Sequence, residues 1–78
     1  MNIILSQNSS KPIYEQIVEQ IKKLILSGSL NANDALPSMR LLAKELRVSL
    51  ITTKRAYEEL ERSGYIYTIA GKGCFVRS

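Results

Sequence analysis

The sequence predicts an α+β domain of mainly α character, a winged helix-turn-helix in which three helices precede a two-stranded β-hairpin. Two observations predict it. Apolar residues recur at three- and four-residue spacings in three consecutive segments, and after Gly64 the period changes to two. Serines and glycines stand where these segments should begin and end. Because 78 residues suffice for only one domain, we assign 1–78 to a single winged-helix unit with a short N-terminal arm at 1–10.

The first predicted helix follows that arm. Ser9 or Ser10 is expected to cap it, with Pro12 in the first turn, and Gly28 is expected to end it. Its apolar stripe consists of Tyr14, Ile17, Ile21, Leu24 and Ile25. The apolar run 3–5 in the arm predicts a terminal strand or an extended segment that docks on another surface, for which a second copy of the chain is one candidate.

The next two helices form the predicted helix-turn-helix. Ser38 is expected to cap the shorter helix, whose buried face should be Leu41, Leu42 and Leu46. After a polar break at 47–49, Ser49 should cap the third helix and Gly64 should end it. The inner face of the third helix follows from the spacing i, i+3, i+4, i+7 and consists of Thr53, Ala56, Tyr57 and Leu60.

A β-hairpin is predicted after Gly64. Residues 65–69 alternate between two faces, and 74–76 form a second apolar run. Between them, 70–73 contain two glycines around Lys72, which is typical of a turn with a basic tip.

Composition argues against most enzyme classes. The chain has no histidine and a single cysteine, Cys74, so neither a zinc site nor a Cys-His or Ser-His catalytic pair can be built. We therefore expect no catalytic residue, no metal and no cofactor. A lone thiol, packed and inert in the hairpin, fits a reducing cytoplasm. No stretch approaches the roughly 20 apolar residues of a membrane span, and the N-terminus does not resemble a signal peptide.

Positive charge is concentrated in the centre of the chain. Residues 38–55 carry a net charge of +4, because Glu45 stands against Arg40, Lys44, Arg47, Lys54 and Arg55. Residues 56–63 are net −2, with Arg62 against three glutamates, and 64–78 are net +2. A surface that binds a polyanion collects charge in this way. The basic first half of the third helix should therefore face phosphate, although an ordinary solvated helix with mixed charges would show a similar pattern.

Several exposed positions carry the chemistry of base and phosphate recognition. The helical wheel places Ile51 and Arg55 facing outward, with Thr52 and Lys54 beside them. Arginine can bind both acceptors of guanine, threonine can bond to a base or touch a thymine methyl, and lysine can neutralise a phosphate. The N-terminus of a helix also attracts phosphate through its free N–H groups. Ile51 has two interpretations, as a contact for base methyl groups or as the rim of the core.

Three further positions are ambiguous on local grounds. Ser38 and Arg40 could contact phosphates, and Arg40 could reach a base, or Ser38 could be only a cap and Arg40 a solvated side chain. Lys72 could contact the minor groove or a phosphate, or it could be a solubilising residue of a plain turn. The tyrosines are expected in the core and at its rim rather than as a platform on which bases stack.

The run from Leu36-Pro37-Ser38-Met39-Arg40 to the closing Gly71-Lys72-Gly73-Cys74-Phe75-Val76 resembles the N-terminal DNA-binding domain of the GntR family of bacterial regulators. The opening 12–17 resembles the first helix of that family, and 48–61 is most similar to its short YtrA-like branch. The resemblance implies DNA contacts from Arg40, Thr52, Lys54 and the wing at 71–73. It also implies a homodimer on a pseudo-palindromic operator and a further effector or dimerisation region, whose ligand the sequence does not identify.

One departure from the family pattern concerns Leu50. Members commonly carry arginine directly after the Val-Ser pair, and arginine is also frequent at the position of Lys54. Lysine cannot reproduce the bidentate fork of arginine, so base recognition should differ at these positions.

The sequence therefore predicts sequence-specific binding of double-stranded DNA by the operator-reading domain of a bacterial transcription regulator. The third helix should enter the major groove, and the wing should touch the minor groove or phosphates. A winged-helix module that binds an acidic protein through the same surface is the alternative. The expected interface consists of Ser38, Arg40, Ser49, Leu50, Ile51, Thr52, Lys54, Arg55, Gly71, Lys72 and Gly73.

Overall fold

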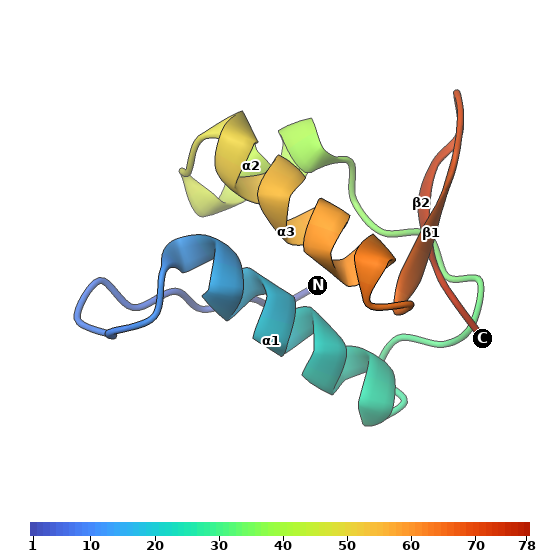
Figure 1. The fold of residues 1–78 in the computed structure, drawn as a ribbon, viewed down its shortest axis with the longest axis horizontal. Coiled ribbons are helices and arrows are strands. Elements are labelled where there is room, and N and C mark those ends of the chain that lie inside the picture. Colours follow the sequence, from blue (N-terminus) through green and yellow to red (C-terminus); the bar gives the residue numbers. More distant parts are fainter.

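The computed structural model describes residues 1–78. Its elements are α1 (Ile13–Leu26), α2 (Met39–Leu46), α3 (Leu50–Arg62), β1 (Ile66–Ile69) and β2 (Gly73–Val76). In Figure 1, α1 and α3 run side by side, α2 lies at the start of α3, and the hairpin stands at the other side with its tip at the top. The winged helix-turn-helix predicted from the sequence is confirmed. No helix is both long enough and apolar enough to cross a membrane.

The helix boundaries follow local capping chemistry. The Ser38 hydroxyl accepts the Leu41 N–H at 3.0 Å, and the Ser49 hydroxyl accepts the Thr52 N–H at 3.2 Å, so both predicted caps are confirmed. The prediction of a serine cap for α1 is wrong. Pro12 occupies the cap position, and its carbonyl accepts the backbone N–H groups of residues 15 and 16 at 3.1 Å. Proline is compatible with this position because a cap N–H has no helical partner to lose.

The N-terminal arm is not a strand, contrary to one of the two forms expected for it. It lies along α1 instead, where two glutamine side chains bond to its backbone. The Gln20 amide accepts the Ile4 N–H at 2.9 Å and donates to the Ile4 carbonyl at 2.6 Å. Gln16 does the same for Ser6, at 2.8 and 3.0 Å. Ile3 and Leu5 pack on the core, whereas Ile4 stays 79% exposed. The arm therefore docks on the first helix of its own chain.

The core lies between α1, α3 and the hairpin. All four residues predicted for the inner face of α3 are buried. The prediction that Leu41 is buried is wrong, because its side chain is 48% exposed. The face of α2 that meets α3 carries Leu42 and Ala43, with Leu46 one turn later, and Leu41 falls at its edge. The core cluster consists of Ile17, Val18, Ile21, Leu36, Leu42, Ala56, Tyr57, Leu60, Ile66, Cys74 and Val76.

The hairpin pairs β1 with β2 in antiparallel register, with Ile66 opposite Val76 and Thr68 opposite Cys74. The segment between α1 and α2 also forms backbone hydrogen bonds with β2, which the sequence did not indicate. The Leu36 N–H donates to the Cys74 carbonyl at 2.9 Å, and the Val76 N–H donates to the Asp34 carbonyl at 2.9 Å. The wing is therefore attached to the segment that leads into the helix-turn-helix.

Candidate nucleic-acid interface

Two buried hydroxyl groups fix the third helix against the beginning of the second. The Thr53 hydroxyl donates to the Met39 carbonyl at 2.8 Å, and the Tyr57 hydroxyl donates to the Pro37 carbonyl at 2.6 Å. Both side chains are almost completely buried, with 0% and 1% exposed. Burial raises the pKa of the Tyr57 hydroxyl well above its usual range, so this hydroxyl stays a neutral donor. The backbone on either side of Ser38 is thus tied to α3, which sets the angle between the two helices.

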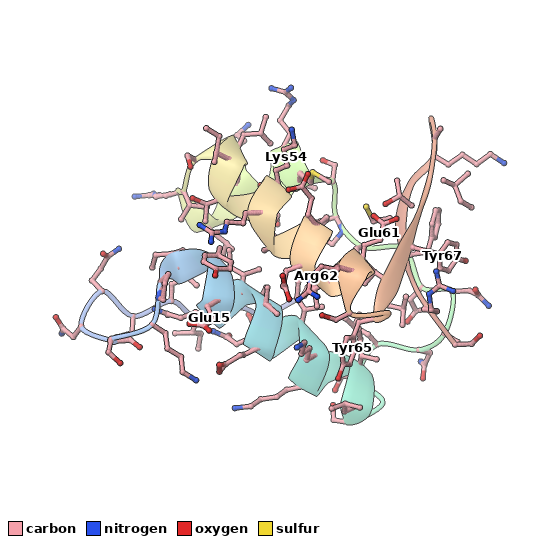
Figure 2. The ribbon with its side chains drawn as sticks, in the orientation of Figure 1. Glu15, Lys54, Glu61, Arg62, Tyr65 and Tyr67 are labelled. Carbon is pink, nitrogen blue, oxygen red and sulfur yellow. The ribbon has the colours of Figure 1, made fainter.

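The first turn of α3 presents apolar and basic side chains to solvent. Ile51 is 77% exposed and Leu50 is 38% exposed. Lys54 is also exposed, and Figure 2 shows it at the upper end of α3, away from Glu61 and Arg62 further along the helix. Thr52 is half-buried, and its hydroxyl shares a hydrogen bond of 2.9 Å with the Ser49 hydroxyl. The predicted basic and apolar outer face is present, but the threonine hydroxyl already has a partner.

Arg55 does not project freely outward, contrary to the expectation from the helical wheel. Its guanidinium carbon lies 3.9 Å from the centroid of the Tyr14 ring in α1, and Nη2 donates to the Tyr14 hydroxyl at 3.3 Å. A guanidinium over an aromatic face is attracted by the ring quadrupole. Arg55 remains exposed to solvent, but its charge is held at the side of α3 that faces α1. The two residues are 41 positions apart, so no local pattern could have paired them.

The wing and the start of α2 line an open groove of about 450 Å³. Ser38 and Met39 line one side, and residues 68–74 line the other. Lys72 is exposed at the tip, where its N–H closes the turn on the Ile69 carbonyl at 2.9 Å. Gly71 and Gly73 flank it with φ angles of 78° and 120°, which residues with a side chain rarely adopt. In Figure 1 the hairpin tip and the start of α2 lie on the same upper side of the molecule.

Carboxylates are concentrated in the second half of α3 and along α1. Glu59 pairs with Arg62, and the hydrogen bond between them lowers the pKa of the glutamate and raises that of the arginine. Glu61 accepts a hydrogen bond of 3.0 Å from the Thr68 hydroxyl. A second hollow, of about 270 Å³ between α1 and α3, is lined by Tyr14, Glu15, Val18, Glu19, Lys22 and Glu59. A polyanion would therefore be attracted to the start of α3 and repelled further along it.

The structure brings most of the predicted site together. Ser38 and the wing residues 71–73 line one groove, and Arg40 is exposed in the first turn of α2 next to it. Residues 49–52 and Lys54 lie in the adjoining turn of α3, which the Thr53 hydroxyl bonds to Met39. Arg55 alone is directed toward α1.

Comparison with known proteins identifies the family. The model of the family described as "Bacterial regulatory proteins, gntR family" matches residues 13–76. The chain belongs to the gntR family. Its sequence is 45% identical over 74 residues to the HTH-type transcriptional repressor YtrA of Bacillus subtilis, a match that covers 95% of this chain and 57% of that repressor. This gntR-family chain thus spans little more than half the length of that relative.

Solved structures share the fold over nearly the whole of this gntR-family chain. YtrA from Sulfolobus acidocaldarius, a GntR-family transcription factor, superposes with a TM-score of 0.91 at 39% identity, covering 97% of this chain and 80% of that one. AraR(DBD) in complex with operator ORX1 superposes with a TM-score of 0.84 at 26% identity, covering 97% of this chain and 95% of that one.

Proposed function

We propose that this gntR-family chain is the operator-reading domain of a bacterial transcription regulator and binds double-stranded DNA in a sequence-specific way. The observation that carries the proposal is the combination of one exposed basic surface, at the starts of α2 and α3 and at the wing, with a fold shared with AraR(DBD) bound to its operator. In this arrangement the first turns of α3 enter the major groove, and the wing lies at the minor groove or its phosphates.

The side chains divide into those that position the domain and those that contact bases. Lys54 and Arg40 are exposed on the adjoining turns and would bind phosphates, or in the case of Arg40 a base edge. Ser38 and Ser49 cap their helices, and the other free N–H groups of each first turn are suited to a phosphate oxygen.

The groove between α2 and the wing accommodates the sugar-phosphate backbone of one strand in this proposal. Gly71 and Gly73 carry no side chain, so the turn can approach the backbone closely, and Lys72 supplies the charge at the tip. Leu50, Ile51 and Thr52 then face the base edges.

Arg55 is proposed to contact a phosphate at the edge of the groove rather than a guanine inside it. Its guanidinium is held over Tyr14 on the side of α3 that faces α1, and reaching a base would require it to leave that ring. If so, replacing it weakens binding to all duplexes by a similar factor.

The remaining properties follow from the proposed role. Two copies would bind the two halves of a pseudo-palindromic operator. When two DNA-binding domains are linked, binding of the first raises the effective concentration of the second, and the overall affinity increases. We infer a cytoplasmic homodimer with no catalytic activity, as expected of a regulator that meets chromosomal DNA.

Selection of duplexes from a random pool tests the proposal. The chain should enrich one motif, and Lys54→Ala should weaken binding to it and lower the slope of log K against log salt by about one. Lys23→Ala is the matched control because this lysine is exposed in the last turn of α1, away from the groove. Enrichment of no motif, together with salt-independent capture of an acidic protein, would support the protein-interaction alternative instead.

A further inference from the structure

Two exposed apolar side chains at the start of α3 lie outside the hydrophobic core. Ile51 is 77% exposed and Leu50 is 38% exposed. Neither belongs to the core cluster or to the partly buried residues packed against it. The structure therefore removes the interpretation of Ile51 as the rim of the core. A β-branched side chain is also restricted in rotation about its first bond, so Ile51 presents a rigid apolar surface.

Most of the polar side chains beside them already have partners within the chain. The Ser49 hydroxyl accepts the Thr52 N–H at 3.2 Å and shares a hydrogen bond of 2.9 Å with the Thr52 hydroxyl. The Arg55 guanidinium lies against Tyr14, 3.9 Å from the ring centroid. Lys54 is exposed, but it is a point charge without a planar fork.

Recognition of a purine by a planar, bidentate side chain is therefore absent from this turn. The planar side chains used for it are arginine on guanine and asparagine or glutamine on adenine, and residues 49–54 contain none of these. Lys54 is the one charged side chain of this turn that can donate to the O6 and N7 acceptors of guanine. Hydrogen-bonded discrimination by this turn therefore depends on Lys54 and on side chains from other parts of the surface, such as Arg40.

One feature of the major groove can be recognised by apolar side chains alone. Thymine carries a methyl group at C5, and the other three bases present only donors and acceptors there. We propose that Leu50 and Ile51 form an apolar contact surface for thymine methyl groups, and that they select operator half-sites with thymines opposite the first turn of α3. This inference rests on the proposed function, because it requires that α3 enters the major groove.

Deoxyuridine provides the direct test, since it pairs as thymine does and lacks only the methyl group. In the duplex enriched from a random pool, each thymine of one half-site is replaced in turn by deoxyuridine, and the affinity of the chain is measured. We expect about a fourfold loss at each contacted position, from the free energy of burying one methyl group. Replacing the same T·A pair by C·G should also weaken binding, and 5-methylcytosine at that position should recover about fourfold.

Variants assign the effect to the two residues. Each variant, Ile51→Ala or Leu50→Ala, should lose the deoxyuridine effect at the thymine that the deleted side chain contacts. At that position the variant should bind the thymine duplex and the deoxyuridine duplex with equal affinity, which is the result of a double-mutant cycle when side chain and methyl group contact each other. Ile4→Ala is the matched control, because Ile4 is an isoleucine of similar exposure, 79%, in the arm. It should retain the full difference between the two duplexes. Lys54→Ala should weaken both duplexes by the same factor.

The outcomes separate this inference from the proposed function. A single enriched motif that binds equally well with thymine or deoxyuridine at every position would overturn methyl recognition and leave operator binding intact. A deoxyuridine effect that persists in the Leu50→Ala, Ile51→Ala double variant would assign methyl recognition to another residue and would also overturn the inference. Failure to enrich any duplex would overturn the proposed function and the inference together.

Discussion

Replacing Tyr57 by phenylalanine tests how α3 is fixed to α2. The hydroxyl is the only hydrogen-bond partner of the Pro37 carbonyl, at 2.6 Å, and the ring is 1% exposed. Tyr57→Phe keeps the ring packing and leaves that carbonyl unpaired, which should lower the free energy of unfolding by about 1–3 kcal/mol. In a domain of this size, the melting temperature should fall by about 4–8 °C for each kcal/mol. Urea unfolding followed by circular dichroism measures the loss, with an unchanged m-value.

The same variant should change how stability depends on pH. Burial raises the pKa of Tyr57 above its ordinary value of 10.0, because the ionised form is penalised inside the protein. The folded state therefore retains a proton that the unfolded state releases. The resulting stability is present below about pH 10 and falls by about 1.4 kcal/mol per pH unit above it. Tyr57→Phe lacks this group, so the difference in stability between parent and variant should shrink between about pH 9 and about pH 11.

Tyr67→Phe is the matched control for both experiments. Its hydroxyl also donates a hydrogen bond, to Asn33 at 2.8 Å, but that bond is exposed to solvent. We expect a loss below about 0.5 kcal/mol for this variant. If Tyr57→Phe changes stability as little as Tyr67→Phe does, the Pro37 carbonyl is satisfied without Tyr57, and the proposed link between α3 and α2 is wrong.

Four other substitutions follow from the backbone and from the Tyr14 contact, and urea unfolding measures each of them. Gly71→Ala should destabilise the wing by about 1 kcal/mol, because φ is 78° at that position; an unchanged midpoint would mean that the turn adopts another conformation. Arg47→Gly should stabilise the chain by up to about 1 kcal/mol, because Arg47 is in the left-handed region with φ 58°, and a loss would show that its side chain stabilises the turn. Arg55→Ala should lower stability by about 0.5–1 kcal/mol through loss of the contact with the Tyr14 ring, whereas Tyr14→Phe, which keeps an aromatic face, should lower it less.

Local chemistry made much of the fold predictable from the sequence. A serine cap is decided within one turn, so Ser38 and Ser49 identified the starts of α2 and α3. The inner face of α3 followed from helical periodicity alone. Leu41 was misplaced because an eight-residue helix has little more than two turns, and the angle at which it meets α3 decides which leucine is buried.

Contacts between distant segments were not predictable in this way. The arm is held by Gln16 and Gln20, polar residues that an apolar stripe does not reveal. The pairing of Arg55 with Tyr14 depends on how α1 and α3 cross, and it changes the role proposed for this arginine. For Leu50 and Ile51, the sequence indicated an unusual start to α3, and only the exposed fractions showed that both side chains lie outside the core.

Sequence-specific binding can be tested by measuring the affinity of the chain for an enriched operator duplex and for a scrambled duplex of the same composition over a series of salt concentrations. We expect tighter binding to the operator at every salt concentration. For both duplexes, log K should fall linearly with log salt, because the release of counterions from the phosphates becomes less favourable as the salt concentration rises. Equal affinity for the two duplexes would contradict sequence-specific recognition. Affinities that do not change with salt would contradict a phosphate-binding surface at the starts of α2 and α3 and at the wing.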